Sequence, residues 1–121
     1  MIICLTTQGR DLDAAMDTTF GRAAFFLFVD DAEMKIVEIV ENTPSAHGAG
    51  VQAAQIVAQR KVDALITAHV GPNAYSGLAA AGVEILAGIT GTARETIDAY
   101  RAGRLERITG ATSAGHGGGR R

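Results

Sequence analysis

The stretch Val62-Asp63-Ala64-Leu65-Ile66-Thr67-Ala68, followed at once by His69-Val70-Gly71-Pro72-Asn73-Ala74, decides the fold of this chain. The first part is short, apolar and partly β-branched, which predicts a buried strand. Pro72 suits the first turn of a helix, because its missing N–H would have no intrahelical partner there. We therefore expect a strand, a tight turn and a helix, the connection at which α/β sheets bind ligands.

Length and composition indicate a single globular domain. The chain has 121 residues, of which 47% are hydrophobic and 20% charged, and its net charge is −2. These values are globular, and the acidic balance argues against nucleic-acid binding. The sequence shows no signal peptide and no apolar run of about 20 residues, so we expect a cytoplasmic protein without membrane contact. The single cysteine, Cys4, rules out an internal disulfide and an all-thiolate metal site.

Apolar patterning on both sides of the decisive stretch predicts a mixed sheet with helices packed on it. A continuous apolar run with three phenylalanines, residues 24–29, indicates a strand covered on both faces, which forms an antiparallel hairpin with the next strand. The expected strands are 1–6, 24–29, 35–41, 62–67 and 83–87, and the expected helices are 50–60, 72–81 and 92–102. The order of elements is therefore βββαβαβα, an α/β fold.

The end of the chain is predicted from its capping signals and composition. Thr92 and Glu95 have the spacing of a capping box, and Gly103 is placed to end the last helix. We expect one domain over residues 1–105. The tail, residues 106–121, is rich in glycine and is expected to be disordered.

His47-Gly48-Ala49-Gly50 leads into the first predicted helix. Gly48 and Gly50 match the start of a dinucleotide-binding pattern, but the stretch does not directly follow a strand and no acidic residue lies about 20 positions later. Two interpretations stay open. One is a glycine loop through which an anion reaches the helix N-terminus, and the other is an ordinary flexible turn.

Two further side chains are candidates. His69 can donate to an anion or ligate a metal, with Gly71 allowing close backbone approach; the alternative is a histidine that a backbone carbonyl satisfies at the end of a buried strand. Arg22 presents a planar fork of donors suited to anions; the alternative is a solvated arginine at a strand edge. Gly88 and Gly91 bracket a turn that predicts a second backbone cradle.

Hydrolytic patterns are absent from the chain. It has no P-loop, nucleophile elbow or His-Glu-x-x-His motif. The first strand carries no carboxylate of the kind that a two-metal nuclease needs, and Asp11, Asp13 and Asp17 follow it in a polar segment where such side chains are usually solvated. Cys4 is expected to be a small core residue. The residues therefore give little support to a hydrolytic enzyme.

Three separated motifs resemble the dinitrogenase iron–molybdenum cofactor biosynthesis family, which includes NifX-type carriers, the C-terminal part of NifB-type proteins and the molybdenum–copper orange protein. The resemblance covers nearly all of residues 1–105, and Ala81-Gly82-Val83 and Gly91-Thr92 add to it. The three motifs are Phe20-Gly21-Arg22-Ala23, His47-Gly48-Ala49-Gly50 and His69-Val70-Gly71-Pro72-Asn73-Ala74.

The resemblance implies a three-layer α/β/α, ribonuclease H-like fold without nuclease activity. It also implies that the chain is not an enzyme but a non-catalytic carrier for an anionic metal–sulfur cluster, such as an iron–molybdenum cofactor precursor or a molybdenum–copper sulfide, in nitrogen fixation. We expect a monomer or weak homo-oligomer that meets cluster donor or acceptor proteins. The alternative is a regulatory small-anion-binding domain of the same fold. By position, the cluster-binding residues are Arg22, His47, Gly48, Gly50, His69, Gly71, Asn73, Gly91 and Thr92, with His47 and His69 as metal ligands.

Overall fold

The computed structural model describes residues 1–43, 48–87 and 91–110. Each element expected from the sequence is present, with boundaries that differ by at most two residues. No helix within the described ranges is long and apolar enough to cross a bilayer. The strands are β1 (Ile2–Thr7), β2 (Phe25–Asp30), β3 (Lys35–Glu41), β4 (Ala64–Thr67), β5 (Glu84–Ala87) and β6 (Glu106–Arg107), and the helices are α1 (Ala49–Ala58), α2 (Pro72–Ala80) and α3 (Ala93–Arg101).

The strands form one mixed sheet in the order β3-β2-β1-β4-β5-β6. β1, β4 and β5 run parallel, with Cys4 opposite Leu65. β2 is antiparallel to both β1 and β3, so the predicted hairpin is confirmed. The carboxyl ends of β1 and β4 therefore meet at one edge of the sheet, the edge at which α/β proteins bind ligands.

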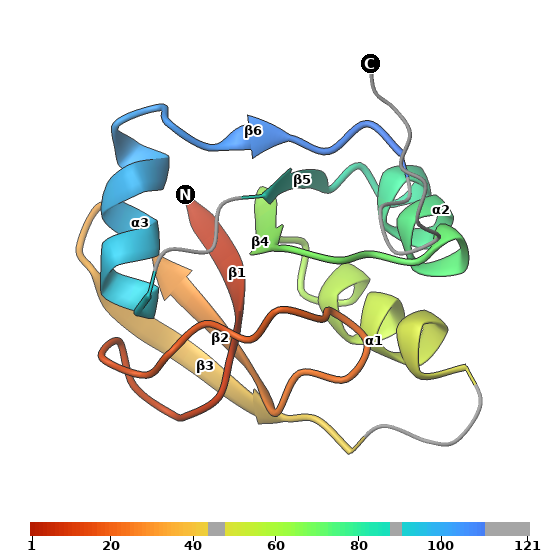
Figure 1. The fold of residues 1–121 in the computed structure, drawn as a ribbon, viewed down its shortest axis with the longest axis horizontal. Helices are drawn as coiled ribbons and strands as arrows, with labels where there is room; N and C mark the ends of the chain where they lie inside the picture. Colours follow the sequence, from red (N-terminus) through yellow and green to blue (C-terminus); the bar gives the residue numbers. More distant parts are fainter. Residues whose placement is uncertain (44–47, 88–90, 111–121) are drawn as a thin grey trace.

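Helices cover both faces of the sheet, which confirms the three-layer α/β/α architecture. Figure 1 shows α1 and α2 on one side of the strands and α3 on the other. Successive side chains of β2 alternate between the two layers, as a strand requires: Phe26 and Phe28 pack in the core under α1 and α2, whereas Leu27 and Val29 pack in the core under α3. The apolar run of β2 is thus buried on both faces, as its composition predicts.

A sixth strand extends the fold beyond the predicted domain boundary at residue 105. Gly103, with a φ of 73°, ends the turn after α3, and β6 then pairs antiparallel with β5. The N–H of Ile108 donates to the carbonyl of Ile85 (2.8 Å), and Ile108 is only 8% exposed. The prediction that the tail begins at residue 106 is therefore wrong. A two-residue strand of exposed charged side chains has no period-2 apolar signal. Residues 111–121 lie outside the described part of the chain.

The connection between β1 and β2 crosses the carboxyl edge of the sheet. The N–H of Asp17 donates to the carbonyl of Thr6 (2.8 Å). One residue further, the N–H of His69 donates to the carbonyl of Thr18 (2.9 Å), and the N–H of Phe20 donates to the carbonyl of His69 (3.0 Å). These backbone bonds bring the Phe20-Gly21-Arg22 stretch beside the loop that follows β4.

Candidate functional site

The N-termini of α1 and α2 meet at one hollow on the surface. Its volume is about 240 Å³, and it is lined by residues 48–51 at the start of α1 and 71–74 at the start of α2. A side chain at Gly50 would come within 3.4 Å of the Cβ of Ala74, so the two helix starts are in close contact. The structure therefore brings together four predicted site residues, Gly48, Gly50, Gly71 and Asn73.

Both of these helices begin without a side-chain cap. The N-cap of α1 is Gly48, whose φ of 73° is a left-handed conformation that favours glycine. The N-cap of α2 is Gly71, followed by Pro72 in the first turn. Neither first turn carries an acidic residue. Within the part of the chain that the structure describes, no side-chain cap or first-turn carboxylate therefore competes with an anion for the N–H groups and positive dipole ends of these two helices.

Arg22 is brought to this hollow by a backbone contact of its neighbour. Gly21 lies so close to the start of α1 that a Cβ atom on it would be 2.9 Å from the nitrogen of Gly50 and 3.0 Å from its Cα. Only glycine permits this approach. Arg22 is exposed and follows the contact directly. It does not line the hollow itself; it lies on the segment that borders it.

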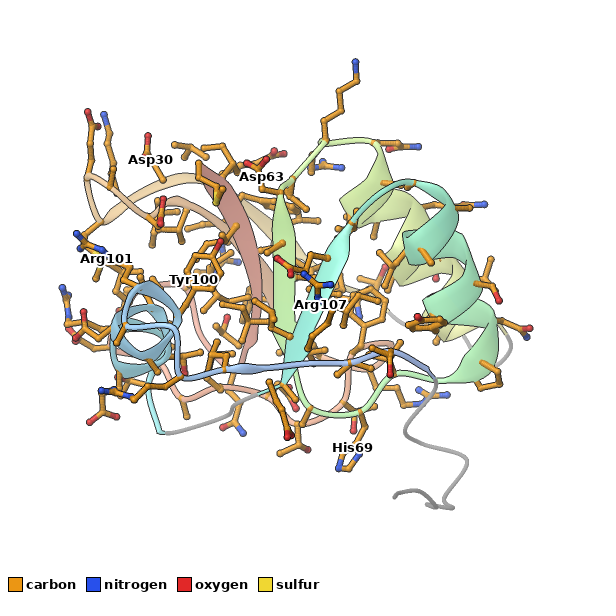
Figure 2. All side chains as sticks on the ribbon, turned by 90° about the horizontal axis from the view of Figure 1, so that it is seen from above. Asp30, Asp63, His69, Tyr100, Arg101 and Arg107 are labelled. Carbon is orange, nitrogen blue, oxygen red and sulfur yellow. The ribbon has the colours of Figure 1, made fainter. Side chains whose placement is uncertain are left out.

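His69 lies on the loop between β4 and α2, two residues before the N-cap of α2. Figure 2 shows its side chain on the outside of this loop, at the opposite end of the sheet from Asp30 and Asp63. The side chain is exposed, so it is not buried at the end of the strand. Like Arg22, His69 borders the hollow and does not line it.

The second cradle, expected between Gly88 and Gly91, stays a prediction, because Gly88 lies outside the described residues; Gly91 and Thr92 are described at the start of α3. The capping box is present: Thr92 Oγ1 accepts from the N–H of Glu95 (3.2 Å), and Glu95 Oε1 accepts from the N–H of Thr92 (3.0 Å). The next two N–H groups, of Ala93 and Arg94, donate to backbone carbonyls of the β1–β2 connection. Because the N–H groups of α3 are satisfied and a carboxylate sits among them, this helix start does not suit an anion, and we remove Gly91 and Thr92 from the candidate site.

The prediction that His47 and His69 ligate a metal stays a prediction. His47 lies outside the described residues, immediately before Gly48. Within the ranges that the structure describes, no three histidine, cysteine, aspartate or glutamate side chains are grouped so as to hold a metal ion. The described part of the site therefore offers N–H donors, an arginine and an imidazole, which suit an anion held by hydrogen bonds.

Cys4 takes no part in this chemistry. It lies in the middle of β1 with no exposed surface, and burial raises the pKa of its thiol far above the ordinary range, although Arg60 acts weakly in the opposite direction. A thiol held in its neutral form is neither a nucleophile nor a metal ligand. The sequence prediction of a small core residue agrees with this position.

Two polar residues that the sequence analysis did not select hold the Arg22 segment in place. The carboxylate of Asp17 accepts from the N–H groups of Thr18 (3.0 Å) and Ala24 (3.2 Å). The amide of Asn42 donates to the carbonyls of Gly21 (3.2 Å) and Ala23 (2.9 Å). A signal for Asn42 existed, since asparagine at the end of a strand and two residues before Pro44 is typical of a turn.

A larger hollow, of about 440 Å³, lies between α2 and the strands β5 and β6. Val83, Ile85 and Ile108 form its apolar part, and Arg107 Nε donates to Glu84 Oε2 at its rim (2.9 Å). It contains none of the predicted site residues and no helix start. We therefore place the candidate site at the smaller hollow, where the sequence motifs converge.

Comparison with known protein families identifies the family of this chain. The model of the family described as dinitrogenase iron-molybdenum cofactor matches residues 1–103. The chain belongs to this family. The family, and with it the α/β fold that the sequence resemblance implies, is therefore confirmed.

Three relatives of this iron–molybdenum cofactor family member are informative. An uncharacterised protein of Methanocaldococcus jannaschii is 35% identical over 93 residues, which are 74% of this chain and 79% of that protein. The structure of the apo form of the orange protein from Desulfovibrio gigas is 36% identical, with a TM-score of 0.85 over 92% of this chain and 95% of that one. A Thermotoga protein described as a NifB protein is 37% identical, with a TM-score of 0.81 over 94% and 98% of the two chains.

Proposed function

We propose that this protein is a non-catalytic carrier for an anionic metal–sulfur cluster, which binds at the hollow between α1 and α2. One observation supports the proposal most directly: two helix N-termini without caps or acidic residues meet at one hollow in a chain of the iron–molybdenum cofactor family. Two adjacent positive dipole ends favour a ligand with more than one negative charge.

The residues around the hollow have different roles in the proposed binding. Gly48, Gly50 and Gly71 leave the backbone N–H groups accessible, because no side chain covers them. Arg22 and His69 approach from the bordering segments and supply a fixed positive charge and an imidazole. His47, which precedes the N-cap of α1 in the sequence, adds a second imidazole to the proposal.

The type of contact suits a cargo that is handed on. The chain offers one thiol, and that thiol is buried in its neutral form, so the cluster would be held by hydrogen bonds and charge and not by several thiolate bonds. Such contacts are individually weak and reversible. We propose an iron–molybdenum cofactor precursor or a molybdenum–copper sulfide as the cargo, a cytoplasmic donor or acceptor protein as the partner, and a role in nitrogen fixation.

Reconstitution without oxygen tests this proposal. The protein is mixed with tetrathiomolybdate and Cu(I) and passed through gel filtration, and bound metal is measured by absorption and metal analysis. We expect the wild type to elute with a metal–sulfur chromophore, and Arg22→Ala and His69→Ala to retain less of it. Arg101→Ala is the matched control, because Arg101 is an exposed arginine on α3, in the opposite layer. The carrier proposal fails if the wild type elutes without metal.

The alternative, a regulatory domain that binds a small anion, uses the same hollow. Helix N-termini bind phosphate and other anions, so the two functions are distinguished by which anion binds. A thermal-shift series with phosphate, nucleotides and tetrathiomolybdate separates them. A shift with phosphate compounds and none with the thiomolybdate would favour the regulatory domain.

A further inference from the structure

Asn42 holds both sides of the turn that carries Arg22. It follows β3 directly and is only 8% exposed. Its Nδ2 donates to the carbonyl oxygens of Gly21 (3.2 Å) and Ala23 (2.9 Å), which are the residues on either side of Arg22. Its backbone N–H donates to the carbonyl of Ala24 (2.9 Å). One buried side chain thus fixes the two peptide groups that flank the arginine.

The apolar residues of the same turn anchor it in the protein core. Phe20 and Ala23 have no exposed surface, and the ring of Phe20 packs against that of Phe26 with 5.7 Å between the centroids. Gly21 rests against the backbone of Gly50. Arg22 is the exposed member of this otherwise packed segment. A shift of the two carbonyls held by Asn42 would therefore move the arginine relative to the start of α1.

We propose that Asn42 is a positioning residue for the anion site. It fixes the Gly21–Ala23 turn and thereby the position from which Arg22 contacts an anion at the hollow. This inference rests on the function proposed above. The amide suits the task, because its NH₂ group supplies two donors for two carbonyl oxygens. Aspartate has the same shape and, when ionised, no donor, so it would place a negative charge against both carbonyls.

A double-mutant cycle on anion binding tests the proposal. The affinity for tetrathiomolybdate is measured by titration for the wild type, Asn42→Ala, Arg22→Ala and the double variant. We expect Asn42→Ala to bind about threefold to tenfold more weakly, the range that one or two lost hydrogen bonds produce, and Asn42→Asp to bind more weakly still. The double variant should bind no more weakly than Arg22→Ala alone, because Asn42 acts through the arginine.

Thr96→Ala supplies the control for a merely structural effect. Thr96 is a fully buried polar residue on α3 whose Oγ1 donates to the carbonyl of Thr92 (2.9 Å), so its loss lowers stability away from the hollow. The proposal is overturned if Thr96→Ala weakens binding as much as Asn42→Ala does, or if the losses of Asn42→Ala and Arg22→Ala simply add.

An NMR comparison separates failure of this inference from failure of the proposed function. Amide resonances of residues 20–24 should move in Asn42→Ala and stay in place in Thr96→Ala, with or without ligand. If the wild type does not bind the anion and these resonances move, the carrier function is wrong and the positional role of Asn42 stands. If they do not move, the inference is wrong.

Discussion

The backbone of Gly21 lies directly against that of Gly50, and a Cβ atom on Gly21 would stand 2.9 Å from the Gly50 nitrogen. Two motifs that are 29 residues apart in the sequence are joined by this contact. It brings the arginine turn to the start of α1, whose other neighbour is the start of α2. The candidate site is therefore a junction of three segments, at which the backbones of Gly21 and Gly50 are in direct contact.

Gly21→Ala should damage this junction. The added methyl group meets backbone atoms that cannot rotate away, so we expect a loss of about 1–3 kcal/mol in the free energy of unfolding and weaker anion binding. Urea unfolding measures the first. Gly77→Ala is the matched control. Gly77 lies inside α2, and a Cβ atom on it would be at an ordinary distance of 3.6 Å from the Cβ of Ala54 in α1. This variant should be as stable as the wild type or more so.

Asn73→Asp should raise the stability of the protein while it weakens anion binding. Asn73 is an exposed residue in the first turn of α2 and lines the hollow. A carboxylate at a helix start stabilises the helix by about 0.3–1 kcal/mol, but it would repel an anion bound there. We expect a small rise in the melting temperature together with weaker tetrathiomolybdate binding. Unchanged binding in this variant would count against the hollow as the anion site; Asn73→Gln controls for side-chain shape.

Thr92→Ala should lower the stability of the protein without changing its affinity for the anion. Loss of the capping box exposes N–H groups of α3, which costs about 1 kcal/mol of stability. Because this helix start lies outside the candidate site, the affinity for the anion should not change. A clear loss of affinity at unchanged protein concentration and fold would return Gly91 and Thr92 to the site.

Cys4 should make the stability of the protein fall at high pH. Its pKa is raised in the folded state from an ordinary value of about 9, so above that pH the unfolded chain loses a proton that the folded chain keeps. The free energy of unfolding then decreases as pH rises, by up to about 1.4 kcal/mol per pH unit for one proton. Urea unfolding between pH 7 and 10 measures the slope, and Cys4→Ala should make it shallower. Equal slopes in the two proteins would contradict the prediction.

Two truncations test the sixth strand. A chain ending at residue 110 keeps β6 and Ile108, and we expect it to unfold at the same urea concentration as the full chain. A chain ending at residue 105 loses the pairing with β5 and the buried Ile108. Removal of a buried isoleucine alone costs about 2–5 kcal/mol, so this shorter chain should be clearly less stable. Equal stability of the two truncated chains would show that β6 contributes nothing.

The local patterns of the sequence determined the elements and the family. These patterns act over a few residues, so the strands and helices can be predicted without a structure. They include the apolar runs of β1, β2 and β4, the proline that opens α2 and the Thr92–Glu95 capping box. β6 is the exception, because two exposed charged residues become a strand only through pairing with β5.

The tertiary structure alone decided which motifs share a site. In the sequence, the starts of α1, α2 and α3 all follow glycine-containing turns, although the Thr92–Glu95 capping box already sets α3 apart. Packing distinguishes them further: α1 and α2 meet without side-chain caps, whereas carbonyls of the β1–β2 connection and the Thr92 hydroxyl accept from the first N–H groups of α3. It also revealed Asn42, whose two hydrogen bonds reach about 20 residues back along the chain. Hydrogen bonds between distant segments depend on how the sheet is ordered, and no local pattern in the sequence encodes that order.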